Sequence, residues 1–199
     1  MCGPRHELLL AETDRLDAAQ LNIDDVLDPK DYILLGYTLD PRTGLGGFQD
    51  YFMKLVGWLK TSSIAEILAK PEVAERVNRI RESDRAFREA LMARSRLDSN
   101  VIFTDFRDLT PPPVGNRFIV YTLFPQANVS LRVHWGPSRD HVAAAVGHSI
   151  FNRTSRTNVG FLMSRYGGGG HKGAGTCLLA AAEADVRIAE MIEIMKKDG

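Results

Sequence analysis

The amino-acid sequence predicts an α/β protein in which residues 99–199 form a domain that folds on its own. Short β-branched or alternating apolar runs, typical of strands, recur from residue 100 onward. Helical patterns stand between them, and a helical pattern over 183–196 closes the chain. A long helical segment with one apolar stripe and many charges precedes this domain, so we expect it to link the domain to a smaller N-terminal part.

The patterns before residue 99 are mainly helical. We expect short helical pieces over 5–27, a helix over 48–60, a short helix after a capping box at Ser63, and a longer helix from Pro71 to about Leu97. The apolar run 32–39 fits either a buried strand or a helix segment. Unless another chain or the C-terminal domain covers this run, it leaves an exposed apolar patch that favours self-association.

The elements of the C-terminal domain follow from the same patterns. We expect strands over 100–106, 128–135, 141–146 and 175–181, helices over 157–166 and 183–196, and a segment 117–124 that fits helix or strand. The alternation is clearest in 128–135, as in a half-buried strand.

Composition excludes several classes of protein. The 199 residues are 44% hydrophobic and 25% charged, with a formal net charge of zero, so no global basic field attracts long nucleic acid. Cys2 and Cys177 are far apart and no C-x-x-C spacing exists, which argues against a disulfide framework or a zinc site. The first fifteen residues resemble neither a signal peptide nor a membrane span, so we expect a cytoplasmic protein that does not bind membranes.

The most informative motif is four glycines followed by His171 and Lys172. Glycines let a ligand approach main-chain N–H groups closely, and a histidine and a lysine beside them add donors for an anion, most often a phosphate. A flexible linker is the alternative interpretation, although linkers are usually serine-rich. A nucleotide P-loop is excluded, because Lys172 is followed by Gly173 rather than by Ser or Thr.

A second polar segment, residues 147–160, lies upstream between a predicted strand and a predicted helix. Arg153 and Arg156 stand where a helix N-terminus should be, which is unfavourable for two cations unless an anion binds among them. The alternative is a surface turn that ends in an N-cap at Ser155 or Thr157. Phe151 and Tyr166 flank the motif and fit either base stacking or packing in the core and rim.

Residues 147–177 resemble the C-terminal substrate-binding domain of DHH-family phosphoesterases, and the likeness extends over about residues 99–199. The family includes single-strand exonucleases, phosphodiesterases of nanoRNA and cyclic dinucleotides, and exopolyphosphatase-related proteins. The resemblance implies a mixed-sheet DHH-associated domain after a linker helix and a partial N-terminal α/β domain. It also implies a phosphate-binding set on this chain. That set is Arg153, Ser155, Arg156, Asn158, Gly168, Gly169, Gly170, His171 and Lys172.

The family's metal ligands come from its N-terminal domain, and there the sequence departs from the pattern. It has no Asp-His-His and no early Asp-x-Asp. Asp40, before Thr43-Gly44, matches the family's last metal-binding aspartate, but it also fits a turn aspartate before Pro41. Asp14 and Asp17 are weaker alternatives, and Asp140-His141 is followed by Val142 and lies in the other domain.

One aspartate cannot hold the two divalent ions of such a centre. We therefore expect residues 1–60 to be the remnant of a catalytic domain, 61–98 a helical linker and 99–199 the substrate-binding domain. The intact enzyme would use manganese or magnesium, whereas this chain would bind no metal stably, have no catalytic residue of its own and be inactive alone.

The sequence leaves three functions open. In the first, the chain is the substrate-binding part of a phosphoesterase that acts on short oligonucleotides, nucleotides or polyphosphate. In the second, it binds phosphate or short single-stranded nucleic acid without catalysis. In the third, it is a structural domain whose glycines only form a tight turn. We also expect the chain to form homodimers or larger species.

Overall fold

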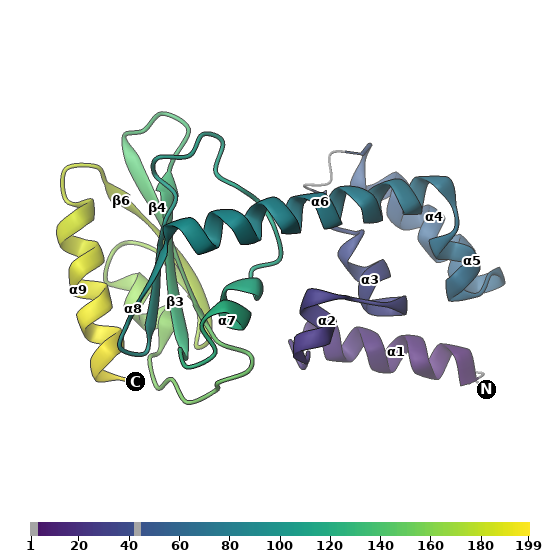
Figure 1. The fold of residues 1–199 in the computed structure, drawn as a ribbon, viewed down its shortest axis with the longest axis horizontal. Coiled ribbons are helices and arrows are strands. Elements are labelled where there is room, and N and C mark those ends of the chain that lie inside the picture. Colours follow the sequence, from purple (N-terminus) through teal and green to yellow (C-terminus); the bar gives the residue numbers. More distant parts are fainter. Residues whose placement is uncertain (1–3, 42–44) are drawn as a thin grey trace. The chain divides into compact units, whose positions relative to one another are not determined.

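The computed structural model describes residues 4–41 and 45–199, which divide into two compact units. Unit 1 is made of the described residues up to Ala86 together with Val114–Asn116, and unit 2 of Phe87–Pro113 and Arg117–Gly199. The dividing point lies inside the long helix α6 (Pro71–Arg94), which contributes to both units (Figure 1). The domain boundaries expected after residues 60 and 98 stay predictions.

Unit 1 is helical throughout the part that the structure describes. Its elements are α1 (Pro4–Asp17), α2 (Ile23–Leu27), α3 (Asp31–Tyr37), α4 (Phe48–Thr61), α5 (Ile64–Leu68) and the first part of α6. The capping box predicted at Ser63 is confirmed, because its hydroxyl accepts from the Glu66 N–H and the Glu66 carboxylate accepts from the Ser63 N–H.

Most of the ambiguous run 32–39 forms the helix α3, and it is buried by other helices of unit 1 rather than by the other chain or the C-terminal domain that we considered. The side chains of Tyr32, Ile33, Leu34 and Leu35 are all buried. Leu34 and Leu35 belong to a core cluster that also contains residues of α4, α5 and α6. These helices of the same unit cover the run, so it needs no sheet to bury its apolar side chains.

Unit 2 is built on a six-stranded sheet in the order β1-β2-β3-β4-β6-β5. The strands are β1 (Ser95–Asp98), β2 (Val101–Asp105), β3 (Val129–Trp135), β4 (His141–His148), β5 (Gly169–His171) and β6 (Ala174–Ala180). Only the β2–β3 pair is parallel, so the sheet is mixed, as the resemblance implied. The parallel pair needs a crossover connection, and that connection contains α7 (Ile119–Leu123).

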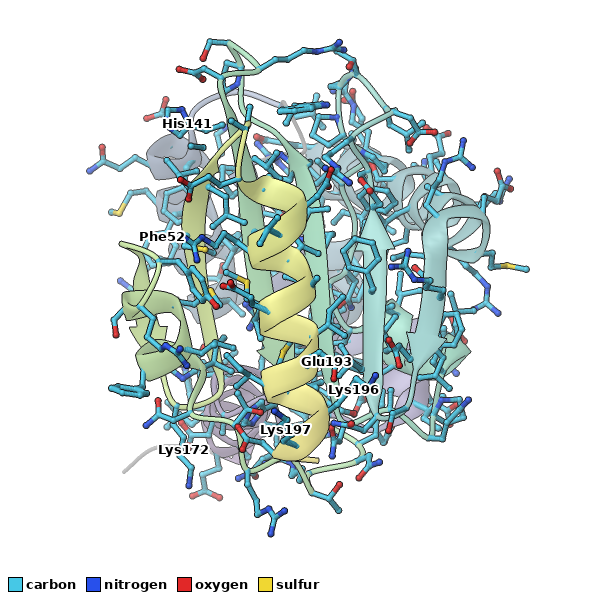
Figure 2. All side chains as sticks on the ribbon, turned by 90° about the vertical axis from the view of Figure 1, so that its left-hand side faces the viewer. Phe52, His141, Lys172, Glu193, Lys196 and Lys197 are labelled. Atoms are coloured by element: carbon cyan, nitrogen blue, oxygen red, sulfur yellow. The ribbon has the colours of Figure 1, made fainter. Side chains whose placement is uncertain are left out.

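Successive side chains of β3 point to opposite faces of the sheet and show what covers each face. Val129, Leu131 and Val133 are fully buried in a core cluster shared with α8 (Val159–Ser164) and α9 (Ala184–Lys197). On the other face, Ser130 is hydrogen-bonded to the Tyr121 hydroxyl of α7 at 2.7 Å, and Arg132 lies over the Phe87 ring of α6. Helices therefore cover both faces, and Figure 2 shows α9 lying along the first of them.

The predicted α/β class is confirmed, and one element boundary is wrong. The charged helix was expected to continue to about Leu97, but α6 ends at Arg94 and the next four residues form β1. Ser99 has a φ of 58° in the turn that follows, and β1 pairs antiparallel with β2. Strand pairing here overrides local helix propensity, a non-local effect that helical periodicity does not reveal.

Among the described residues, no helix is both long and apolar enough to cross a membrane.

Candidate functional site

Three separate segments meet at one end of the sheet of unit 2. They are the end of β4 at His148, residues 157–160 at the start of α8, and residues 168–173 around β5, and we call them together the glycine–histidine site. The His148 N–H donates to the Gly173 carbonyl at 2.9 Å, and the Val159 N–H donates to the Lys172 carbonyl at 3.0 Å. In Figure 2, Lys172 lies at the end of the sheet away from His141, where β4 begins.

Glycines make this close approach sterically allowed. A Cβ on Gly160 would lie 2.8 Å from the Gly170 carbonyl oxygen, and one on Gly175 would lie 2.7 Å from the Gly169 carbonyl oxygen. A Cβ on Gly168 or Gly170 would clash with the backbone of β6. The glycine run is therefore not a flexible linker, because it packs tightly against both α8 and β6.

The glycines form a strand rather than only the turn that we expected. Gly167, with a φ of 75°, ends the turn after α8, and Gly169–His171 then pair with β6 as the edge strand β5. Every residue of β5 is exposed. An exposed edge strand offers backbone groups and side chains to a ligand.

His171 and Lys172 present polar groups to solvent beside this edge. Both residues are exposed. The Nδ1 atom of His171 accepts a hydrogen bond from the Gly173 N–H at 3.1 Å, so the proton of its neutral ring is on Nε2. Among the described residues, no carboxylate pairs with the Lys172 ammonium group. Two donors are thus available to an anion.

The upstream residues of the predicted phosphate-binding set differ in exposure and in hydrogen bonding. Asn158 caps α8 by accepting from the Phe161 N–H at 3.1 Å, so its side-chain oxygen already has a structural role. Arg156 is exposed, and its Nε lies 3.5 Å from the Asp198 carbonyl oxygen. Arg153 is exposed, and its Nε donates to the Ile150 carbonyl. The Ser155 hydroxyl is buried without a hydrogen-bond partner in the described part of the chain.

The two flanking aromatic residues are partly buried. Tyr166 packs against the core beneath α9, and its hydroxyl donates to Glu190 at 3.2 Å. This position agrees with packing in the core and rim, one of the two alternatives for Tyr166.

Charge is distributed unevenly along the chain, although its sum is zero. From Asp140 to Glu183 the intervening sequence contains no Asp or Glu. It contains four Lys or Arg residues, namely Arg153, Arg156, Arg165 and Lys172. The glycine–histidine site is drawn entirely from this segment, so its local charge favours an anionic ligand.

His148 is a residue of this site that the sequence analysis did not select. Its Nε2 atom lies 2.9 Å from the Thr157 carbonyl oxygen. Burial lowers the pKa of the ring below 6.5, and the nearby charges of Lys172 and His171 lower it further, while the bond to Thr157 acts in the opposite direction. The signal that could have revealed it is a histidine at the end of a strand inside the acid-free segment.

The predicted metal residues do not assemble into a centre. Within residues 4–41 and 45–199, no group of three or more His, Cys, Asp or Glu side chains could hold a metal ion. Asp40 follows α3, and its N–H donates to the Tyr37 carbonyl, whereas Thr43 and Gly44 lie outside the described residues. Asp14 and Asp17 are exposed on α1. Asp140 pairs with His141 at the far end of β4 from His148.

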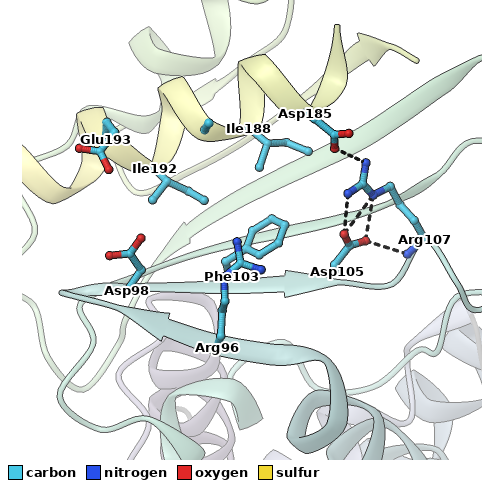
Figure 3. A pocket seen from close by; sticks show the side chains of 10 residues that line it. Arg96, Asp98, Phe103, Asp105, Arg107, Asp185, Ile188, Ile192 and Glu193 are labelled. Atoms are coloured by element: carbon cyan, nitrogen blue, oxygen red, sulfur yellow. Dashed lines mark hydrogen bonds and ion pairs between the residues drawn. The ribbon is translucent and has the colours of Figure 1, made fainter. Parts of the chain in front are cut away.

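A cavity of about 350 Å³ in unit 2 lies elsewhere, between the β1–β2 edge of the sheet and α9 (Figure 3). Arg107 forms ion pairs there with Asp105 and Asp185, and the Arg96 guanidinium lies over the Phe103 ring. Because the Arg107 charge is already matched by carboxylates, this cavity is a weaker candidate for anion binding than the glycine–histidine site.

Comparison with known proteins identifies similar structures. Neither a protein-family model nor a curated protein sequence matches the chain. The solved structure of a pGpG-specific phosphodiesterase, PggH from Vibrio cholerae, is similar with a TM-score of 0.90 and 38% sequence identity, over 98% of this chain and 68% of that one. This chain thus spans about two thirds of the length of that protein.

Two more distant structures are also similar. A DHH-domain member of the s1p family of ribosomal proteins has a TM-score of 0.52 and 15% identity, over 93% of this chain and 46% of that one, and supports the fold alone. An exopolyphosphatase-related protein from Bacteroides fragilis has a TM-score of 0.46 and 12% identity, over 71% of this chain and 44% of that one, which is too distant to carry an argument.

The glycine packing predicts that substitutions at two adjacent positions change the stability of the chain by different amounts. Gly170→Ala should destabilise the chain by roughly 2–4 kcal/mol, because the new methyl group meets the β6 backbone. Gly169→Ala is the matched control, since nothing lies within 4 Å of its Cβ position, and should change stability by less than about 1 kcal/mol. Urea denaturation of both variants measures the difference. Equal stability of the two would show that the close approach at Gly170 is not required.

The environment of His148 predicts its titration. In an NMR pH titration its pKa should lie below 6.5, and Lys172→Gln should raise it because one repelling charge is removed. Lys197→Gln serves as the control and should leave it unchanged. Since the folded ring binds its proton less tightly than the unfolded ring, His148 should make the chain less stable as the pH falls below 6.5. A His148 pKa above 6.5 would contradict the burial and charge argument.

Proposed function

Because this chain belongs to the DHH family of phosphoesterases, we propose that its unit 2 binds a phosphate group of a short nucleotide at the glycine–histidine site. The observation that carries the proposal is the pair His171 and Lys172, exposed at the end of the edge strand β5, whose first two residues are glycines that leave the backbone unshielded. Donors on a segment without carboxylates suit a phosphate oxygen, which only accepts hydrogen bonds.

A short oligonucleotide fits this site better than a long nucleic acid. The acid-free segment gives local positive charge, while the zero net charge of the chain supplies no extended basic surface. The similar protein from Vibrio cholerae is described as specific for pGpG. We therefore propose a 5′-phosphorylated dinucleotide, with pGpG as the probe, as the ligand of this chain.

The residues of the described chain bind and orient the phosphate but do not fit a metal centre. Phosphoesterases of this family generally depend on divalent metal ions, which polarise the phosphoryl group when bound. Asp40 is the one residue of the chain that we propose as a ligand of such an ion, and it belongs to no cluster of ligands among the described residues. Manganese or magnesium and a homodimer stay predictions.

A second candidate function is capture of the nucleotide without hydrolysis. The observation that favours it is that all residues of the predicted phosphate-binding set lie in unit 2. Binding then needs only groups that this unit contains, and it needs no carboxylate.

Binding by the full chain should depend on His171. In titration calorimetry with pGpG, His171→Ala should weaken binding by roughly 1–3 kcal/mol, the usual scale for a lost charge-assisted contact. His141→Ala is the matched control, because this histidine is also exposed but lies at the other end of β4. We expect a smaller loss for Arg156→Ala, whose side chain also contacts the Asp198 carbonyl. Unchanged affinity in the His171 and Arg156 variants would place the phosphate site elsewhere.

Hydrolysis tests whether the chain is catalytic on its own. The purified chain should release little or no product from pGpG with manganese present, because the described residues lack a metal-binding cluster. Product analysis by chromatography, with and without a chelator, measures this. Robust manganese-dependent turnover that survives Asp40→Asn would overturn both the binding-only function and the role of Asp40.

A further inference from the structure

Two histidine rings flank the same glycine of the glycine–histidine site. A Cβ on Gly173 would lie 3.6 Å from Cε1 of His171 and 3.9 Å from Nδ1 of His148. Gly173 has no side chain to fill that space. His148 comes from the end of β4 and His171 from β5, so the fold brings together two rings that are far apart in the sequence.

The hydrogen bonds of the two rings give them opposite roles. The Thr157 carbonyl can only accept, so Nε2 of His148 carries the proton and Nδ1 of the neutral ring is an acceptor. In His171 the assignment is reversed, because Nδ1 accepts from the Gly173 N–H and Nε2 is the donor. One ring thus offers a donor, and the other offers an acceptor.

The acceptor of His148 is open to a ligand. Within the described residues, no group donates a hydrogen bond to its Nδ1, and this atom is not among the buried atoms that lack a partner. Burial and the nearby Lys172 charge lower the pKa of the ring below 6.5, which favours its neutral form near pH 7. A neutral acceptor does not bind a phosphate oxygen, which also only accepts. A ligand group that bonds to Nδ1 of His148 therefore has to be a hydrogen-bond donor.

We propose that Nδ1 of His148 accepts a hydrogen bond from a ribose hydroxyl of the bound nucleotide and so selects ribonucleotides over deoxyribonucleotides. The inference rests on the proposed function, because the phosphate held beside His171 fixes where the sugar lies. The sugar hydroxyls are the donors nearest to a nucleotide phosphate, whereas the N–H groups of the base lie farther away. A hydroxyl on the sugar is also the group by which proteins distinguish RNA from DNA.

The test compares pGpG with its 2′-deoxy and 3′-deoxy analogues in titrations of the full chain, well above pH 6.5. At least one analogue should bind about tenfold more weakly than pGpG, the effect of one lost hydrogen bond. His148→Gln keeps an amide N–H near the Nε2 position for the Thr157 carbonyl but has no acceptor at the Nδ1 position. The affinity of His148→Gln for pGpG should equal the affinity of the unsubstituted chain for that analogue. Its affinity for the analogue should be the same as that of the unsubstituted chain.

Two further variants separate the possible failures. His148→Asn can place its amide oxygen near the Nδ1 position and should keep part of the selectivity. His171→Ala should weaken pGpG and its analogues equally, because it removes a contact to the phosphate. One failure concerns only His148. It is the case in which His171→Ala weakens pGpG binding, but either both analogues bind as well as pGpG or the selectivity persists in His148→Gln. The proposed role of His148 is then wrong, and the proposed function stands. If His171→Ala has no effect, the proposed function fails.

Imidazole ¹⁵N NMR provides a readout that does not depend on folding of the variants. In the complex with pGpG, Nδ1 of His148 should remain unprotonated, with a shift typical of a hydrogen-bonded acceptor. A doubly protonated ring in the complex would mean that His148 binds the phosphate as a cation, and it would overturn the proposal.

Discussion

The close backbone approach between β5, β6 and the start of α8 is the constraint on which the candidate site depends. Side chains at Gly160, Gly168, Gly170 or Gly175 would collide with backbone atoms or with the side chain of Met163. Because these positions have none, the Lys172 carbonyl can accept from the first residue of α8. That bond ties Lys172 to α8, and the bond from the His148 N–H to the Gly173 carbonyl ties the same segment to the end of β4. Without the approach, the site would be a loose loop near a strand end.

The fold supports this arrangement from the opposite face of the sheet. The Tyr121 hydroxyl of α7 donates to the Gly147 carbonyl at 2.7 Å, next to His148, and Ser130 of β3 is bonded to the same hydroxyl. Tyr121 is buried, and burial raises the pKa of its hydroxyl, so it stays protonated as a donor. The end of β4 is thus fixed by backbone bonds on one side and by a buried tyrosine on the other. This rigidity would help Nδ1 of His148 to accept a hydrogen bond from a ligand, because the direction of the ring is set before binding.

Local patterns predicted the elements, and non-local contacts account for most of what they missed. The alternation in 128–135 is confirmed as β3, and the closing helix as α9, because each buries one face of a regular element. Helical periodicity could not show that Ser95–Asp98 pair with β2, nor that α4, α5 and α6 would bury the run 32–39. At the candidate site, the residue types alone were enough to select His171 and Lys172 as candidates for phosphate binding. Asn158 caps α8 through a local bond from the Phe161 N–H, whereas the position of the His148 ring depends on its contact with the Thr157 carbonyl of another segment, which the sequence does not reveal.

The central claim, that an anionic nucleotide binds at the glycine–histidine site, is tested most directly by mapping amide chemical-shift changes in the ¹⁵N-labelled chain as pGpG is added. The account predicts the largest changes at His148, at residues 157–160 and at residues 168–173, with smaller ones along α9. Largest changes around Arg96, Arg107 and Asp185, which line the cavity beside α9, would contradict it.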